Sequence, residues 1–277
     1  MTFKNIVVHL DDGGRPAGRV DVAAGLALGF DAHLAGLYLV KRPELPRYAP
    51  RAGADILHER YREWQREQVD RMRAQFQEQT ARAGVIGEFR FSDADPVDTM
   101  ALHARYADLI VLGQFDPEDT QALMGGDFAE RVMLECGRPV LLVPYAGRCE
   151  TPGKRILVAW NASREAARAV SAALPLLRRA AKVIVMAINP ANAGDHGEQP
   201  GADIALFLAR HGVPVTATSH TVEDVDAGSW LLSRASDAEI DLIVMGGYGH
   251  SRIRELAFGG VTRTLMQSMT VPVLMAH

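Results

Sequence analysis

Asp241-Leu-Ile-Val-Met-Gly-Gly-Tyr-Gly-His250 is the stretch that decides the fold class of this chain. Its residues 242–245 are all apolar, as expected for a strand of a parallel sheet that is covered on both faces. Gly246 and Gly249 follow directly, and Gly259 comes after nine intervening residues. Because glycine has no β-carbon, it allows a positive φ and a close approach of the backbone to a ligand. The stretch therefore predicts a buried strand that ends in a glycine-rich loop.

This loop leads into an expected helix over residues 261–269. The first N–H groups of a helix have no partner within it, and the helix dipole favours negative charge at that end. Successive N–H groups of a glycine-rich loop can also surround an anion. Two interpretations stay open: a clamp for phosphate groups, or glycines that only make tight turns between a strand and a helix.

Length and composition exclude several classes of protein. A chain of 277 residues suits two domains of about 140 residues. The net charge of −4, without a basic stripe, argues against a nucleic-acid partner. Two cysteines are too few for a disulfide framework, and no run of about 18 apolar residues predicts a membrane span. We therefore expect a soluble cytoplasmic protein that binds neither nucleic acid nor membranes.

Strands and helices alternate along both halves of the chain. Expected strands cover residues 6–10, 33–40, 85–91, 109–112 and 139–143 in the first half, and 156–160, 182–188, 213–219, 242–245 and 272–274 in the second. Helices are expected between them, among them a long charged helix near residues 57–76, one over residues 120–135 and one over residues 163–177. Such alternation predicts βαβ units and a parallel sheet.

The second half repeats the first. Ile156-Leu-Val matches Ile6-Val-Val at a distance of 150 residues, whereas Asp241-Leu-Ile-Val matches Asp108-Leu-Ile-Val at a distance of 133. The second copy therefore lacks about 17 residues between its first and fourth strands, and the long charged helix is the natural place for the difference. We expect two domains, residues 1–145 and 155–277, each a five-stranded α/β unit.

The order of a strand, Gly-x2-Gly-x9-Gly, a helix and a final Pro-Val-Leu strand resembles the universal stress protein family. The resemblance covers the whole chain as two tandem copies. It implies a Rossmann-like or flavodoxin-like parallel sheet in each copy, with the two copies packed as a pseudo-dimer through their last strands. It also implies ATP or another adenine nucleotide as the ligand of the C-terminal copy, with or without Mg²⁺. A dimer of whole chains stays open.

The resemblance also implies which residues bind the nucleotide. Gly246, Gly249 and Gly259 match the phosphate-loop glycines, and Asn161 stands where the family has an aspartate beside the adenosine. Gly260 replaces the usual Ser or Thr, so a hydroxyl donor is missing there. The predicted nucleotide-binding residues are Ala159, Trp160, Asn161, Ala187, Met245, Gly246, Gly249, His250, Arg252, Gly259, Gly260, Val261 and Thr262.

The first copy departs further from the family pattern. Asp116 and Asp127 stand where the second copy has Gly249 and Gly260. A carboxylate at a helix N-terminus would take the place of an anion and repel a triphosphate. The N-terminal half is therefore predicted to be free of ATP.

Nothing in the sequence predicts a catalytic site. Arg252 breaks a Gly-x-Gly-x-x-Gly dinucleotide motif, and no P-loop motif occurs. His250 and Ser251 lack a nucleophile elbow, and the histidines lack metal-ligand spacing. We therefore expect a sensor or regulator of stress responses and not an enzyme, although weak hydrolysis of ATP stays open.

Two other functions stay open. The chain could be a nucleotide-free scaffold that binds protein partners through the tandem pseudo-dimer, with purely structural glycines. A metabolic enzyme on the same fold rests on analogy of fold alone.

Overall fold

The structure of the chain is a computed structural model that describes residues 2–13, 17–40, 51–119, 124–147, 151–189, 200–222, 225–248 and 260–277. The side chains of residue 17 and residues 51–58 lie outside this description. All structural statements below concern the described residues.

The elements follow the expected alternation in both halves. The N-terminal half contains β1 (Asn5–Leu10), α1 (Ala17–Phe30), β2 (His33–Leu39), α2 (Arg51–Arg82), β3 (Gly87–Ser92), α3 (Pro96–Ala104), β4 (Leu109–Gly113), α4 (Phe128–Cys136) and β5 (Val140–Val143). The C-terminal half contains β6 (Arg155–Trp160), α5 (Arg164–Leu177), β7 (Lys182–Ile188), α7 (Ala202–Arg210), β8 (Val215–His220), α8 (Ala227–Asp237), β9 (Leu242–Gly246), α10 (Val261–Ser268) and β10 (Val273–Ala276).

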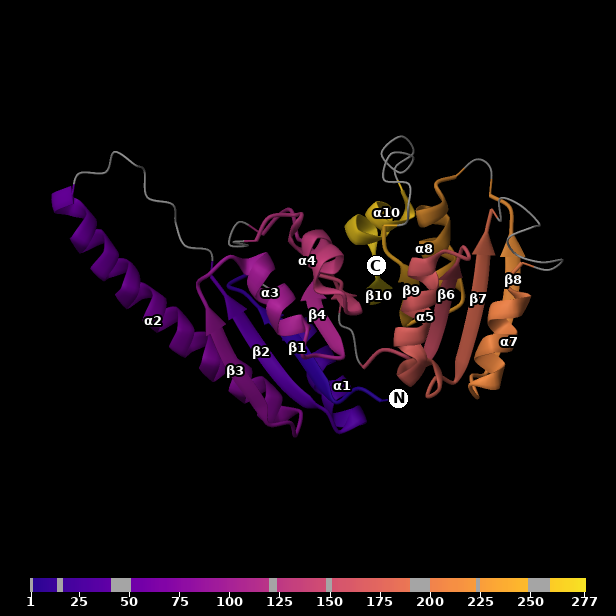
Figure 1. Cartoon of the computed structure of the whole chain (residues 1–277), viewed down its shortest axis with the longest axis horizontal. Helices are drawn as coiled ribbons and strands as arrows, with labels where there is room; N and C mark the ends of the chain where they lie inside the picture. The colour runs from indigo at the N-terminus through magenta and orange to yellow at the C-terminus, as the bar shows by residue number, and fades with distance from the viewer. Residues whose placement is uncertain are drawn as a thin grey trace.

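The ten strands form one continuous sheet in the order β3-β2-β1-β4-β5-β10-β9-β6-β7-β8. Within each half all neighbouring strands are parallel, whereas β5 and β10 pair antiparallel, with Leu141 opposite Leu274. Figure 1 shows the two halves side by side, with β3 and β8 at opposite ends of the sheet. The expected doubly wound α/β fold and the pairing of the last strands are confirmed.

Helices cover both faces of the sheet, and the apolar strands contribute alternate side chains to the two faces. Leu242 and Val244 of β9 belong to one core with α1, α2, α5 and α7, and Ile243 and Met245 to the other with α3, α4, α8 and α10. Each core contains side chains from both halves, such as Leu141 and Leu274 in the first. Burial on both faces explains the continuous apolar run that is visible in the sequence.

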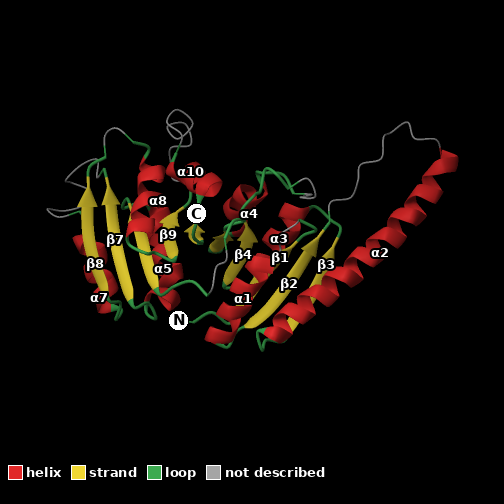
Figure 2. Ribbon diagram, turned by 180° about the vertical axis from the view of Figure 1, so that it is seen from behind, coloured by secondary structure: helices red, strands yellow, loops and turns green. Residues whose placement is uncertain are grey.

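Helix α2 is much longer than its counterpart in the second half, and helix α4 begins later than the sequence predicted. α2 spans 32 residues and its counterpart α7 spans 9, which explains the shorter second copy. In both views α2 extends beyond the edge of the sheet (Figures 1 and 2). α4 begins at Phe128, later than the helix expected from residue 120, and residues 124–127 are not helical. Gly125 and Gly126 explain the later start, because glycine is a poor helix former.

The repeated Asp-Leu-Ile-Val motif has a structural role at its aspartate. The carboxylate of Asp241 accepts hydrogen bonds from the backbone N–H groups of Gly153 (3.0 Å), Lys154 (2.9 Å) and Arg155 (3.1 Å). Its counterpart Asp108 accepts from the N–H groups that precede and begin β1. In both halves the aspartate before the fourth strand therefore aligns the start of the first strand.

Asp241→Ala is expected to lower the free energy of unfolding by roughly 2 to 3 kcal/mol, because it leaves three backbone donors without a charged acceptor. Urea denaturation followed by circular dichroism measures the change. Glu135→Ala, at an exposed position of α4, is the control and is expected to change stability by less than about 0.5 kcal/mol. Equal losses in the two variants would contradict the role of Asp241.

Candidate functional site

The predicted site residues of the C-terminal half gather where the order of the strands reverses. β6 has β7 on one side and β9 on the other, so the chain winds away from β6 in both directions. Ala159 lies opposite Met245 in the register of β6 and β9. Asn161, which follows β6, and Gly246, which ends β9, therefore lie at the carboxyl ends of two neighbouring strands. Ligands of doubly wound folds bind beyond the carboxyl ends of the strands at such a switch point.

Asn161 is exposed and takes part in the turn that leads into α5. Its side-chain oxygen accepts the N–H of Ser163 at 3.1 Å, and Ser163 caps the helix by accepting the N–H of Ala166 at 3.1 Å. Ala162, between them, has a φ of 57°. The Asn161 oxygen uses one lone pair in the turn, so this side chain can offer its amide NH₂ group and the second lone pair of its oxygen to a ligand.

Gly246 lies against the backbone of α5. A β-carbon on Gly246 would lie 2.5 Å from the backbone nitrogen of Ala166 and 2.8 Å from the carbonyl carbon of Glu165. The backbone of the helix cannot move away as a flexible side chain could. Glycine is therefore required at this position by packing, whether or not a ligand binds nearby.

Glu165 lies in the first turn of α5 and is not among the predicted site residues. Its side chain is 3% exposed, and one carboxylate oxygen lies 3.2 Å from an Arg164 guanidinium nitrogen. It places a buried carboxylate close to the end of β9. Burial depends on how closely α5 approaches β9, and no local pattern of sequence reports that distance.

The end of the glycine-rich stretch is the start of α10. Gly260 is the residue before the helix, and no side chain caps it. Within the described part of the chain, the N–H groups of Val261 and Thr262 have no acceptor. Thr262 as a whole is 4% exposed, whereas Val261 is half-buried, so the amide of Val261 is the more accessible of the two. Free amides at a helix N-terminus fit an anion such as a phosphate group.

Of the remaining predicted residues, the structure describes Trp160 and Ala187. Trp160 is partly buried against a core. Ala187, which lies opposite it in the register, is 0% exposed as a whole residue, so the predicted contact of its backbone with a ligand is not supported. Gly249, His250, Arg252 and Gly259 lie outside the described residues, and their roles stay predictions.

The equivalent place in the N-terminal half contains a small cavity of about 80 Å³. Asp11, Gly113 and Gly126, the counterparts of Asn161, Gly246 and Gly259, all line it. Arg19 also lines this cavity and forms an ion pair with Asp11. A β-carbon on Gly113 would lie 2.8 Å from an Arg19 guanidinium nitrogen. At the equivalent position of the C-terminal half, a β-carbon on Gly246 would instead meet the backbone of α5. A guanidinium therefore fills this part of the N-terminal half.

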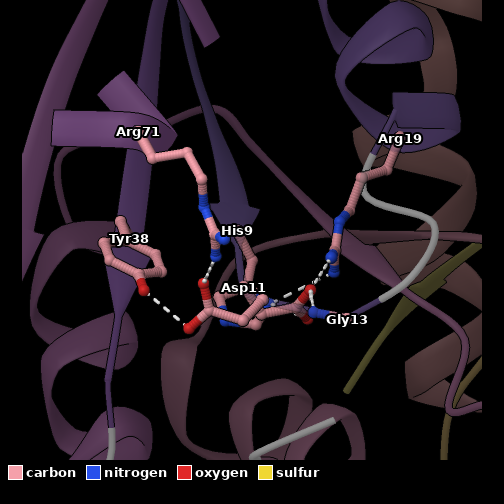
Figure 3. A network of polar contacts seen from close by, with 7 residues as sticks. His9, Asp11, Gly13, Arg19, Tyr38 and Arg71 are labelled. Carbon is pink, nitrogen blue, oxygen red and sulfur yellow. Dashed lines mark hydrogen bonds and ion pairs between the residues drawn. The ribbon is translucent and has the colours of Figure 1, made fainter. Parts of the chain in front are cut away.

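Figure 3 shows Arg19 pointing toward Asp11. Tyr38 and Arg71 each contact the carboxylate of the neighbouring Asp12. The Tyr38 hydroxyl donates to Asp12 at 2.6 Å, and burial together with this hydrogen bond raises the pKa of Tyr38. Burial alone would raise the pKa of Asp11, but the charge of Arg19 outweighs it together with smaller contributions, so that this pKa is lowered. The acidic pair after β1 thus belongs to a structural network.

Arg19 and His9 were not predicted from the sequence. His9 is 2% exposed, and its Nδ1 lies 3.3 Å from an Arg19 guanidinium nitrogen. The sequence attributed the loss of ATP binding in this half to Asp116 and Asp127, of which Asp116 lines the cavity and Asp127 is exposed. No sequence motif links His9 to Arg19, so only the packing of α1 on the sheet could reveal the pair.

No group of three His, Cys, Asp or Glu side chains could hold a metal ion among the residues that the structure describes. None of the described helices is both long and apolar enough to span a membrane.

The fold and the switch-point site define a tandem α/β protein in which each half is a doubly wound unit. The chain belongs to the universal stress protein family, whose model matches residues 2–144 and 153–277. The universal stress protein Slr1230 of Synechocystis is 25% identical over 171 residues. That match covers 60% of this chain and spans 57% of the length of the relative.

Solved structures agree with the fold. A universal stress protein of Archaeoglobus fulgidus has a TM-score of 0.69 at 16% identity, over 98% of this chain and 94% of the other. A functionally unknown protein of Pseudomonas aeruginosa has a TM-score of 0.55 at 16% identity, over 98% of this chain and 92% of the other. At such identities these similarities bear on the fold of both halves together and not on the ligand.

Proposed function

We propose that this protein binds an adenine nucleotide, with ATP as the favoured ligand, in a C-terminal domain of residues 155–277. In this proposal it is a cytoplasmic sensor or regulator that passes the nucleotide state to protein partners. The observation that carries the proposal is that Asn161 and Gly246 lie at the carboxyl ends of the neighbouring strands β6 and β9, at the switch point of the strand order. Membership of the universal stress protein family supports it.

Each described residue has a role in this proposal that follows from its chemistry. The amides of Val261 and Thr262 would donate to phosphate oxygens, helped by the dipole of α10. Asn161 would donate its NH₂ group to the ribose or the base. Because the described residues contain no cluster that could hold a metal ion, Mg²⁺ would arrive with the nucleotide.

A sensor agrees better with these residues than an enzyme does. The described groups around the switch point are backbone amides, an amide side chain and the Glu165 carboxylate with its Arg164 partner. Hydrolysis would need a positioned base or metal for the attacking water. The proposal therefore assigns no dedicated catalytic residue, and any hydrolysis of ATP would be weak.

The nucleotide-free scaffold is favoured by one observation. Gly246 is explained by its contact with the backbone of α5, without any ligand. In that function the antiparallel pairing of β5 with β10 would hold a fixed surface for protein partners.

Calorimetric titration of ATP is expected to show one site in the wild type and at least about tenfold weaker binding in Gly260→Asp. Aspartate is a favourable residue at a helix N-cap, so this substitution keeps the helix while adding a repelling charge. Gly18→Glu adds a negative charge at an exposed position in the first turn of α1, where a β-carbon has nothing within 4 Å. This variant is the control and is expected to leave ATP affinity unchanged.

Gly249→Asp is expected to weaken binding in the same way. Equal affinity in the wild type and both aspartate variants would disprove the proposed site. A wild type that neither binds ATP nor retains a nucleotide in mass spectrometry of the gently purified protein would favour the scaffold.

A further inference from the structure

A cleft of about 830 Å³ lies between the two halves. It is lined from both sides by Gln114, Phe115, Pro117, Gly126, Asp127, Ala129, Glu130, Leu142, Tyr248, Gly260, Arg263, Met266 and Gln267. Tyr248 and Gly260, the described residues on either side of the glycine-rich stretch, both belong to this lining. The N-terminal half therefore borders the two ends of the proposed phosphate loop.

One contact across the halves holds the helix that follows the loop. The side-chain amide of Gln114 donates to the backbone carbonyl of Met266 at 3.1 Å, and its oxygen accepts the N–H of Tyr145 at 3.2 Å. Met266 lies in the last turn of α10, where carbonyl groups have no partner within the helix. Gln114 is 8% exposed, so water competes little for this hydrogen bond.

A second contact holds the residue that precedes the loop. A β-carbon on Gly247 would lie 2.6 Å from the sulfur of Met133, which belongs to α4 and is 1% exposed. Gly247 also donates its N–H to the carbonyl of Ala276 at 2.9 Å. The chain therefore enters the loop at a point fixed between β10 and a side chain of the N-terminal half.

These two contacts use equivalent positions of the two copies in opposite ways. Gly247 is the counterpart of Gln114, and Met266 is the counterpart of Met133, each at a distance of 133 residues. In one copy the long side chain of Gln114 crosses to the other half, and in the other copy the glycine makes room for Met133. The contacts are thus asymmetric, and both place an N-terminal residue against the C-terminal loop ends.

We propose that the N-terminal half controls the nucleotide affinity of the C-terminal half, with Gln114 and Met133 as positioning residues for the two ends of the phosphate loop. This inference rests on the proposed function of the C-terminal half. Gln114 fixes the orientation of α10, whose first amides would meet the phosphates, and Met133 fixes the backbone at Gly247. The N-terminal copy then has a function that does not require a nucleotide of its own.

Gln114→Glu tests the first contact. A carboxylate can still accept from the N–H of Tyr145 but cannot donate to the carbonyl of Met266. The Kd for ATP, measured by calorimetry, is expected to rise about fivefold or more, as for a typical coupling between sites. Gln114→Asn, which is uncharged and too short to span both partners, is expected to act in the same direction. Gln267→Ala, an exposed change in the same cleft, is the control and should stay within about twofold of the wild type.

Hydrogen exchange gives a readout that does not require the nucleotide. In both Gln114 variants the amides of Arg263 and Thr264, which donate to the carbonyl of Gly260, are expected to exchange faster than in the wild type. In Met133→Ala the amide of Gly247, which donates to Ala276, is expected to exchange faster as well. An unchanged Kd in both Gln114 variants, with the wild type binding ATP, overturns the proposal. If the wild type binds no ATP, the proposed function fails, and the exchange rates alone decide: faster exchange supports positioning by the N-terminal half, and unchanged exchange overturns it.

Discussion

The free energy of unfolding is expected to fall by roughly 2 to 3 kcal/mol as the pH is lowered from 6.5 to 4.5, because of His9. Burial lowers the pKa of His9 from 6.5 to about 3. The charge of Asp11 raises this pKa and the charge of Arg19 lowers it, both by smaller amounts. In the unfolded chain the same imidazole takes up a proton near pH 6.5. Between these two values the unfolded state binds more protons than the folded state, so stability is present above pH 6.5 and is lost as the pH falls.

Urea denaturation at pH steps between 6.5 and 4.5 measures this slope. The lowered pKa of Asp11 acts in the same direction, but its effect begins only near pH 4, where an unfolded carboxyl takes up protons. His9→Asn is expected to lose most of the slope, at a cost in stability at neutral pH from the lost packing on Phe128. His211→Gln, a change at an exposed histidine of the other half, should keep the slope. An unchanged slope in His9→Asn would show that His9 is not the cause.

The fold could be predicted from the sequence because its signals are local and repeated. The apolar run before Gly246 reports a strand buried on both faces, and the two Asp-Leu-Ile-Val motifs report equivalent strands. The difference in spacing between the copies located the long helix α2 in the first copy. Ser163, which caps α5, is of a residue type that helices favour at that position.

The contacts that define the sites could not be predicted in this way. Arg19 meets His9 and Asp11 only because α1 packs at a particular height on β1. Gln114 reaches Met266 across 152 residues of sequence, through the pairing of β5 with β10. Such contacts depend on how closely helices and strands approach one another. The periodicity and residue types of a sequence do not predict these distances.

The packing of Gly246 also could not be predicted from the sequence. Its position in the motif predicted a phosphate contact, and the structure adds a contact with the backbone of α5. Gly246→Ala is expected to lower the free energy of unfolding by about 3 kcal/mol. The added methyl group would lie 2.5 Å from the backbone nitrogen of Ala166, and a helix backbone gives way less easily than a side chain. Thermal and urea denaturation measure the loss.

Gly18→Ala is the matched control, because a β-carbon there has nothing within 4 Å. It lies within α1, where replacing glycine by alanine is expected to stabilise the protein by up to about 1 kcal/mol. A Gly246→Ala protein as stable as the wild type would disprove the packing role. If that stable variant had also lost ATP binding, Gly246 would have to act on the ligand itself, because its contact with α5 would then be dispensable for folding.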